Sequence, residues 1–246
     1  MEGKVCIVTG GAMGLGLADA VALSREGARV VITDVNTEAG RRAVEEMGRG
    51  VKFVAHDVTR EDQWENLVDQ VMSEFGRIDV LVNNAGIIAE TEIESTDLDT
   101  WRKVNAVSVE GTFLGCKHVI KAMRTLADDP DFRGSIINMS SVCAIVGFPT
   151  IVAYAAAKSA ILGLTRTVAA HCHVNALPIR CNAILPGNMD TPMVRSFVGD
   201  AVASVSSMGT AADIGEAVLY LADDRSRYLN GAEIVIDNGI RTVGRI

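Results

Sequence analysis

Three side chains near the middle of the chain bring together groups that can move a proton. Ser141 precedes Tyr154 by thirteen residues, and Tyr154 precedes Lys158 by four. Residues four apart lie one turn apart on the same face of a helix, so the Lys158 ammonium would lie close to the Tyr154 phenol. A free phenol has a pKa of about 10 and is a poor base at neutral pH. A neighbouring cation favours the phenolate, so the spacing predicts a tyrosine that ionises more readily than usual.

A glycine-rich segment near the N-terminus has the composition of a phosphate-binding turn. It runs from Val8 to Gly16, spaces its glycines as G-x3-G-x-G, and joins an apolar run to a helical pattern. Glycines let the backbone turn tightly and approach a pyrophosphate, and the following helix N-terminus adds unpaired N–H groups and a partial positive charge. Such a turn is weak evidence by itself, because similar segments are often only tight turns.

An acidic residue about twenty positions further on strengthens this interpretation. Asp34 ends the second predicted strand, where its carboxylate could accept hydrogen bonds from both adenosine ribose hydroxyls of a dinucleotide. A 2′-phosphate would meet like charge there, and Met13, which precedes the second glycine, offers no compensating cation. The pattern favours NAD over NADP. The alternative is that Asp34 only caps the following helix.

Two further predicted strand ends carry polar residues at the same edge. Asp57 and Val58 follow the third strand, and the segment from Asn83 to Gly86 ends the fourth. Open α/β sheets bind ligands at the carboxyl ends of their strands. Asp57 could accept from an adenine amino group and Asn84 could face the nicotinamide ribose, although either residue could simply form a turn.

The elements that would position these residues form a doubly wound parallel sheet. Short β-branched runs, nearly continuous in apolar residues, alternate with longer stretches of helical period. The predicted strands span residues 5–9, 29–33, 52–55, 80–83, 135–139, 180–185 and 233–236. The predicted helices span residues 14–26, 37–47, 61–75, 98–121, 154–171 and 212–222. We expect one Rossmann-like α/β domain over residues 1–246, with about seven strands, helices on both faces and no second sheet.

Composition and charge narrow the possible functions. The chain is 48% hydrophobic and shows no linker or low-complexity tract. A net charge of -8 would repel a phosphate backbone, so nucleic acid is not an expected partner. No apolar run reaches the roughly 18 to 20 residues that span a bilayer, and no signal-peptide pattern precedes the first strand. These features predict a cytoplasmic protein without a membrane partner.

No metal site is expected from the histidines and cysteines. The five cysteines are widely spaced without a C-x-x-C pair, which favours reduced core thiols. His171, Cys172 and His173 are consecutive, but neighbours at i and i+2 of a helix point to different faces.

Taken together, the motifs resemble the short-chain dehydrogenase/reductase family. They comprise Thr9 to Gly16, Asn83 to Gly86, Ser141 with Tyr154 and Lys158, and Pro186-Gly187 followed by Thr191. Their order and spacing match the family over almost the whole chain. The stretch between Lys158 and Ile179, the Thr191-Pro192-Met193 segment and the Asp237-Asn238-Gly239 ending are similar to bacterial 3β/17β-hydroxysteroid dehydrogenases.

The resemblance implies a role for each residue. Tyr154 would be the general acid/base for a secondary alcohol, Ser141 would hydrogen-bond the substrate oxygen, and Lys158 would hold the nicotinamide ribose and lower the Tyr154 pKa. Met189 and Thr191 would fix the carboxamide. The full set expected to bind NAD is Gly10, Met13, Gly14, Leu15, Gly16, Asp34, Val35, Asp57, Val58, Asn84, Ala85, Gly86, Tyr154, Lys158, Pro186, Gly187, Met189 and Thr191.

One position departs from the family pattern. An ungapped match between Trp101 and Gly111 places Ser108 where the family usually has an asparagine that anchors a proton-relay water. A serine can hold a water, but its hydroxyl cannot reproduce the separate donor and acceptor of an amide. Asn105 lies three residues earlier, near the same helical face, and is the alternative.

Apolar residues are expected around the substrate, which favours a neutral secondary alcohol or ketone, either a hydroxysteroid or a cyclic or aryl alcohol. The expected rim is Ile87, Ile88, Val142, Ile145, Phe148 and Pro149, and the expected lid, residues 192–208, adds Met193, Val194, Phe197, Val202 and Val205, with Arg195 as its only cation. The alternatives are a ketoacyl-carrier-type reductase and a catalytically idle NAD-binding sensor or scaffold. The helices predicted at 98–121 and 154–171 suggest, by resemblance, a homotetramer, with a dimer as the alternative.

Overall fold

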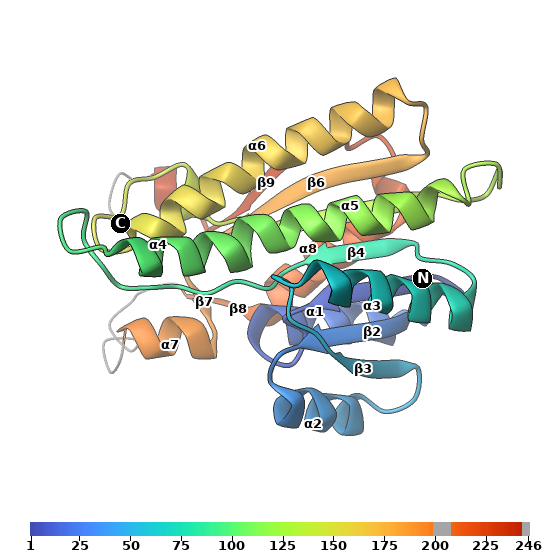
Figure 1. The fold of residues 1–246 in the computed structure, drawn as a ribbon, viewed down its shortest axis with the longest axis horizontal. Coiled ribbons are helices and arrows are strands. Elements are labelled where there is room, and N and C mark those ends of the chain that lie inside the picture. The colour runs from blue at the N-terminus through green and yellow to red at the C-terminus, as the bar shows by residue number, and fades with distance from the viewer. Residues whose placement is uncertain (199–207, 243–246) are drawn as a thin grey trace.

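A parallel seven-stranded sheet forms the centre of the molecule (Figure 1), and the strand order is β3-β2-β1-β4-β5-β6-β9. The computed structural model describes residues 1–198 and 208–242. The strands are β1 (Val5–Thr9), β2 (Arg29–Asp34), β3 (Val51–Ala55), β4 (Val80–Asn83), β5 (Gly134–Met139), β6 (Ile179–Pro186) and β9 (Glu233–Ile236). All seven predicted strands are confirmed, with ends that differ by one residue at most.

Helices cover both faces of this sheet. The helices are α1 (Gly14–Arg25), α2 (Thr37–Met47), α3 (Glu61–Phe75), α4 (Leu98–Asn105), α5 (Gly111–Arg124), α6 (Val152–Val174), α7 (Pro192–Val198) and α8 (Ala211–Ala222). One core holds side chains of α1, α2 and α8, and the other holds those of α3, α5 and α6. The α/β doubly wound fold predicted from the sequence is therefore confirmed.

The continuous apolar runs are explained by these two cores. In β1, Val5 and Ile7 pack into the α3/α5/α6 core, whereas Cys6 and Val8 pack into the α1/α8 core. Successive side chains of a strand point to opposite faces, so a strand covered on both sides must be apolar at every position. Each of these four side chains has no exposed surface.

The strand order reverses next to β1, and this reversal positions the ligand site. The chain proceeds outward from β1 to β2 and β3 and then returns to place β4 on the other side of β1. The connections that follow β1 and β4 therefore leave the sheet in opposite directions and open a crevice at the carboxyl edge. Gly10 and Asn84 each follow the last residue of one of these two strands.

The helix predicted over residues 98–121 is formed but is not α-helical throughout. It consists of α4, a π-helical turn over Ala106–Glu110, and α5. The hydroxyl of Thr112 donates to the backbone carbonyl of Ser108 at 2.7 Å within this region. Turns of this type inside α-helices are frequent at functional sites, and here the turn contains Ser108.

The expectation of a single sheet was wrong, because the structure contains a second, short sheet. β7 (Met189–Asp190) pairs in parallel with β8 (Gly209–Thr210) to form a separate two-stranded sheet. Of the predicted lid, the structure describes α7 and Met208, while residues 199–207, with Val202 and Val205, lie outside the described residues. None of the described helices is long and apolar enough to cross a membrane.

Candidate active site

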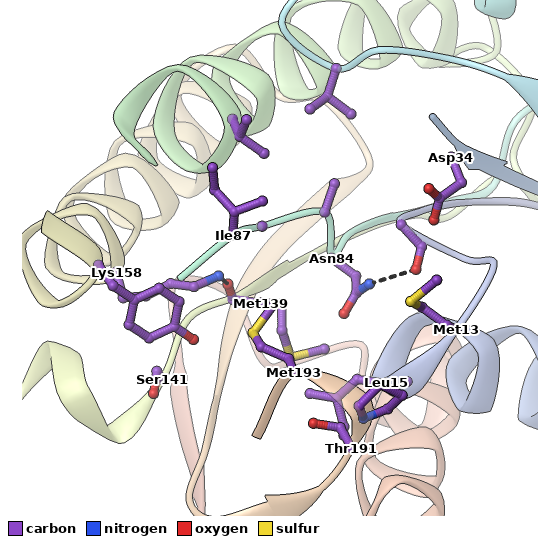
Figure 2. Close-up of a pocket in the computed structure, with 18 of the residues that line it drawn as sticks. Met13, Leu15, Asp34, Asn84, Ile87, Met139, Ser141, Lys158, Thr191 and Met193 are labelled. Atoms are coloured by element: carbon purple, nitrogen blue, oxygen red, sulfur yellow. Dashed lines mark hydrogen bonds between the residues drawn. The ribbon is translucent and has the colours of Figure 1, made fainter. Parts of the chain in front are cut away.

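A cavity of about 660 Å³ lies along the carboxyl edge of the sheet (Figure 2). It is lined by almost every residue predicted to bind the cofactor or to act in catalysis. These are Gly10, Met13, Gly14, Leu15, Asp34, Val35, Asp57, Val58, Asn84, Ala85, Gly86, Ser141, Tyr154, Lys158, Pro186, Gly187, Met189 and Thr191. Gly16 and Ser108 are the two predicted residues that do not line it.

The turn after β1 requires its glycines. Gly10 and Gly14 have φ angles of +63° and +58°, in the left-handed region that side chains disfavour. Gly16 lies behind the turn, where an added Cβ would be 2.3 Å from the carbonyl oxygen of Gly10. The helix α1 can therefore approach the turn only with glycine at this position.

Asn84 holds this turn against β4. Its side-chain Nδ2 donates to the carbonyl oxygens of Thr9 and Gly10 at 3.0 and 3.1 Å. The hydroxyl of Thr9 in turn accepts from the backbone N–H groups of Asn84 and Ala85. Asn84 was predicted to face a nicotinamide ribose; it lines the cavity, but its amide N–H donors bind the turn.

Asp34 lies at the nucleotide end of the cavity, at the end of β2. Its two carboxylate oxygens accept from the backbone N–H groups of Ala12, at 3.3 Å, and Asn36, at 2.9 Å. The N-cap of α2 is Asn36, whose side chain accepts from Ala39. Asp34 is therefore not the helix cap, and its carboxylate is fixed beside the glycine-rich turn.

Asp57 is fixed by its own turn. One of its carboxylate oxygens accepts from both the backbone N–H and the hydroxyl of Thr59, at 3.0 and 2.8 Å. Before it, His56 is buried, and its Nδ1 lies 3.1 Å from the Thr33 hydroxyl. Burial lowers the pKa of His56 to about 4, so the imidazole is neutral at physiological pH.

The three residues expected to carry the chemistry converge at the other end of the cavity. Ser141, Tyr154 and Lys158 all line the cavity, and Figure 2 shows Ser141 and Lys158 at the same end of it. Ser141 follows β5, whereas Tyr154 and Lys158 belong to the first turns of α6. The Lys158 Nζ lies 5.4 Å from the centre of the Tyr154 ring and donates to the carbonyl oxygen of Met139 at 2.7 Å.

Burial shifts both ionisable groups toward their neutral forms. The Lys158 side chain is buried, and desolvation lowers its pKa to about 8. Burial raises the pKa of Tyr154 above its ordinary value, and hydrogen bonding with Ser141 acts in the opposite direction. The prediction that Lys158, together with a bound nicotinamide, lowers the Tyr154 pKa stays a prediction, because it concerns the site with its cofactor.

The two candidates for the proton relay occupy different environments. Ser108 is fully buried, and its Oγ has no hydrogen-bond partner. A Cβ added to Gly86 would lie 3.6 Å from this Oγ and 3.3 Å from the Lys158 Nζ, so both groups border the same space. Asn105 instead donates its side-chain amide to the Trp101 carbonyl at 2.8 Å and does not line the cavity.

The residues predicted for the substrate rim and lid lie only partly in the cavity wall. Ile87 of the rim and Met193 and Val194 of the lid line the cavity. The other five predicted rim residues, Ile88, Val142, Ile145, Phe148 and Pro149, do not. Met139 at the end of β5 also lines the cavity. Arg195 points its charge at Asp190, with N–O distances of 2.6 and 2.7 Å.

Several lining residues were missed by the sequence reasoning: His56, Thr59, Lys103, Ala106, Val107, Met139 and Ser140. Most of them are neighbours of predicted residues along the chain. Their positions at the ends of strands could therefore have predicted them from the sequence. Lys103, Ala106 and Val107 are different, because they come from α4 and the following π-turn. Only the packing of this helix over the crevice places them in the wall.

Comparison with known proteins agrees with this geometry. The family model described as enoyl-(acyl carrier protein) reductase matches residues 10–241, which is most of the chain. With a doubly wound sheet, a glycine-rich turn and the Ser141, Tyr154 and Lys158 arrangement in one cavity, the chain belongs to the short-chain dehydrogenase/reductase family.

Curated relatives match over nearly their full length. A cyclopentanol dehydrogenase of Comamonas testosteroni is 37% identical over 249 residues, covering 96% of each chain. An NADP-dependent (R)-specific alcohol dehydrogenase of Lentilactobacillus kefiri is 36% identical and covers 97% of each chain. A 3-beta-hydroxysteroid dehydrogenase of Comamonas testosteroni is 35% identical, covering 99% of this chain and 98% of its own. Relatives of similar identity thus differ in substrate.

Proposed function

We propose that this protein is an NAD-dependent dehydrogenase that interconverts an apolar secondary alcohol and its ketone. The observation that carries the proposal is the convergence of Ser141, Tyr154 and Lys158 in the same cavity as Asp34 and the glycine-rich turn. The relatives named as cyclopentanol, alcohol and hydroxysteroid dehydrogenases support this substrate class. A bound nicotinamide would supply the hydride acceptor in oxidation and the hydride donor in reduction.

The residues at the nucleotide end fit a dinucleotide. The Gly10 carbonyl and the Asn84 amide occupy the space that a Cβ of Gly16 would fill. The turn is therefore tight, as in turns whose backbone binds a pyrophosphate. The Asp34 carboxylate is fixed where it would accept from the ribose hydroxyls and repel a 2′-phosphate. One relative is NADP-dependent, so the choice of cofactor is a specific property that Asp34 is expected to set in this chain.

At the chemical end, each residue would handle one part of the proton transfer. In oxidation, the Tyr154 phenolate would take the proton of the substrate hydroxyl as the hydride leaves the carbinol carbon. The positive charges of Lys158 and of a bound nicotinamide would favour that phenolate against the effect of burial. Ser141 holds the substrate oxygen by a hydrogen bond and stabilises its developing charge. Lys158, still mostly protonated at neutral pH with a pKa of about 8, supplies positive charge beside the phenol. The Ser108 hydroxyl would hold a water through which the proton leaves.

The deciding experiment follows NADH formation with purified protein and a panel of cyclic alcohols, aryl alcohols and hydroxysteroids, with NADP in parallel. We expect activity with at least one class and a preference for NAD. An Asp34→Ser variant should lose most of that preference, because it removes the charge that repels a 2′-phosphate. Turnover of an acyl thioester with NADPH, and none of the alcohols with NAD, would replace this proposal with the acyl-carrier reductase.

A catalytically idle, NAD-binding sensor is the remaining alternative. It predicts saturable NAD binding without turnover of any alcohol or ketone in the panel.

We also expect a homotetramer, since the apolar Phe113 on α5 is 48% exposed in the single chain. Light scattering after size exclusion would distinguish four copies from two.

A further inference from the structure

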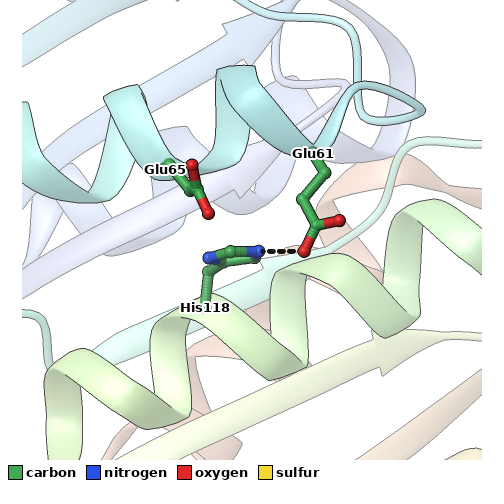
Figure 3. Close-up of side chains that lie close together, drawn as sticks. All are labelled: Glu61, Glu65 and His118. Atoms are coloured by element: carbon green, nitrogen blue, oxygen red, sulfur yellow. Dashed lines mark hydrogen bonds and ion pairs between the residues drawn. The ribbon is translucent and has the colours of Figure 1, made fainter.

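A second cluster of chemically active side chains lies between α3 and α5, outside the cavity. Glu61 and Glu65 lie one turn apart on α3, and His118 faces them from α5 (Figure 3). Their potential ligand atoms all lie within 4.8 Å of one another. Among the described residues, 1–198 and 208–242, this is the one group of three His, Cys, Asp or Glu side chains with such geometry.

The cluster differs from a group of exposed acidic residues because it contains a buried histidine. The His118 side chain is 6% exposed, and its Nε2 lies 3.1 Å from a carboxylate oxygen of Glu61. Figure 3 shows the imidazole between the two glutamates, with the Glu65 carboxylate turned toward it. Lone pairs on a nitrogen and an oxygen at this distance repel unless a proton or a metal ion lies between them.

The Glu61 carboxylate already contacts two side chains of α5. One of its oxygens accepts a hydrogen bond from Lys117 and lies against the His118 imidazole. Lys117 also forms an ion pair with Glu61. A metal ion would therefore compete with the Lys117 ammonium and with a proton on His118.

We propose that Glu61, Glu65 and His118 bind one divalent transition-metal ion, preferably Zn²⁺, that ties α3 to α5. Zinc binds imidazole nitrogen and carboxylate oxygen at about 2.0 to 2.2 Å, which puts two ligand atoms of a tetrahedral site roughly 3.3 Å apart. The His118–Glu61 distance of 3.1 Å fits this value. Glu65 is exposed and can close by a side-chain rotation, and water completes the shell. An imidazole ligand disfavours Mg²⁺ and Ca²⁺, which prefer oxygen.

The position of this site connects it to the cavity wall. α3 begins two residues after Thr59, which lines the cavity, and α5 follows the π-turn that contains Ser108. An ion bound to the folded chain but not to the unfolded chain stabilises the fold by mass action. The bound ion would stabilise the packing of α3 against α5, next to two segments of the cavity wall, and would take no part in the reaction.

The test is a titration of the full chain, freed of metal by dialysis against a chelator, with Zn²⁺ by calorimetry and with Co²⁺ by absorption spectroscopy. We expect one Zn²⁺ per chain and a rise in melting temperature when it binds. The Glu65→Gln variant, exposed and safe for folding, should weaken Zn²⁺ binding by on the order of tenfold or more. Lys117→Gln should strengthen binding, because it removes the competing cation.

Two controls separate this site from adventitious binding. Glu46→Gln changes an exposed glutamate on α2 and should leave the affinity unchanged. A double variant with His171→Gln and His173→Gln removes exposed histidines at the end of α6 and should also leave it unchanged. Absence of saturable Zn²⁺ binding would show that His118 and Glu61 share only a proton. Equal Zn²⁺ affinity of wild type and Glu65→Gln would show that Glu65 is not a ligand. Either result would overturn the proposal.

Discussion

The two ends of the cavity differ in how their polar atoms are satisfied. At the nucleotide end, the Asp34 carboxylate and the Asn84 amide are hydrogen-bonded to backbone groups of the same chain. At the chemical end, burial raises the pKa of Tyr154 and lowers the pKa of Lys158, which favours the neutral form of each side chain. The Ser108 hydroxyl there has no hydrogen-bond partner. The polar groups of the nucleotide end are therefore held in place by hydrogen bonds within the chain. The ionisable groups of the chemical end are desolvated, which is common for residues that act in catalysis. Substitutions should therefore affect binding at one end and turnover at the other.

The largest effect should come from Tyr154→Phe. Removing the phenolic oxygen eliminates the group expected to exchange the proton, so turnover should fall by about 10²- to 10⁴-fold. The affinity for NAD, measured by fluorescence titration, should change little, because the nucleotide end is untouched. Tyr228→Phe is a matched control, since Tyr228 is fully exposed and does not line the cavity. Equal turnover in Tyr154→Phe and wild type would remove the phenol from the mechanism.

Gly16→Ala should produce the opposite pattern. The new Cβ would lie 2.3 Å from the Gly10 carbonyl oxygen and 2.4 Å from the Asn84 Nδ2, so the turn must move. We expect a loss of roughly 1–3 kcal/mol in the free energy of unfolding and a clear weakening of NAD binding. Gly163→Ala in α6, where a Cβ meets nothing within 4 Å, should instead stabilise the chain slightly. If Gly16→Ala bound NAD normally, the turn would not be the rigid cradle described here.

Asp19 lies outside both ends of the cavity, and its burial should make the stability of the fold depend on pH. This carboxyl on α1 is fully buried, neither of its oxygens has a hydrogen-bond partner, and burial raises its pKa well above the ordinary value. The folded chain therefore binds this proton more tightly than the unfolded chain, and the resulting stability is lost as the pH rises from about 4 toward the folded pKa.

An Asp19→Asn variant cannot ionise and should be more stable than wild type at pH 7, by about 1–3 kcal/mol. The difference should shrink as the pH falls toward about 4, which chemical denaturation at several pH values would measure. Asp69→Asn, at an exposed position on α3, should show no such trend. A stability difference independent of pH would mean that ionisation of Asp19 is not its cause.

The smallest effect should come from Ser108→Ala. The hydroxyl has no partner within the chain, so its removal should leave the free energy of unfolding nearly unchanged. If a water held by Ser108 carries the proton onward, turnover should fall a few-fold, and more strongly at low pH, where the proton must leave against a higher proton concentration. Asn105→Ala, whose amide is already bound to Trp101, should not change turnover. Equal rates for both variants across pH would exclude this relay.

Much of the fold and most of the site could be predicted because their signals are local. Strands covered on both faces must be apolar throughout, so the seven runs marked the sheet directly. The glycine spacing, Asp34 and the four-residue step from Tyr154 to Lys158 depend on backbone geometry within a few residues. For this reason almost all of these positions line the same cavity.

The sequence alone determined the order of strands and helices, the glycine-rich turn and the residues able to move a proton. The tertiary structure decided what depends on contacts between distant segments. It showed that burial raises the Tyr154 pKa, that Ser108 rather than Asn105 borders the lysine, and that Ile145 lies outside the cavity wall. It also brought His118 against Glu61, 57 residues away. Desolvation and packing are sums over such neighbours, and no periodicity or local spacing along the chain records them.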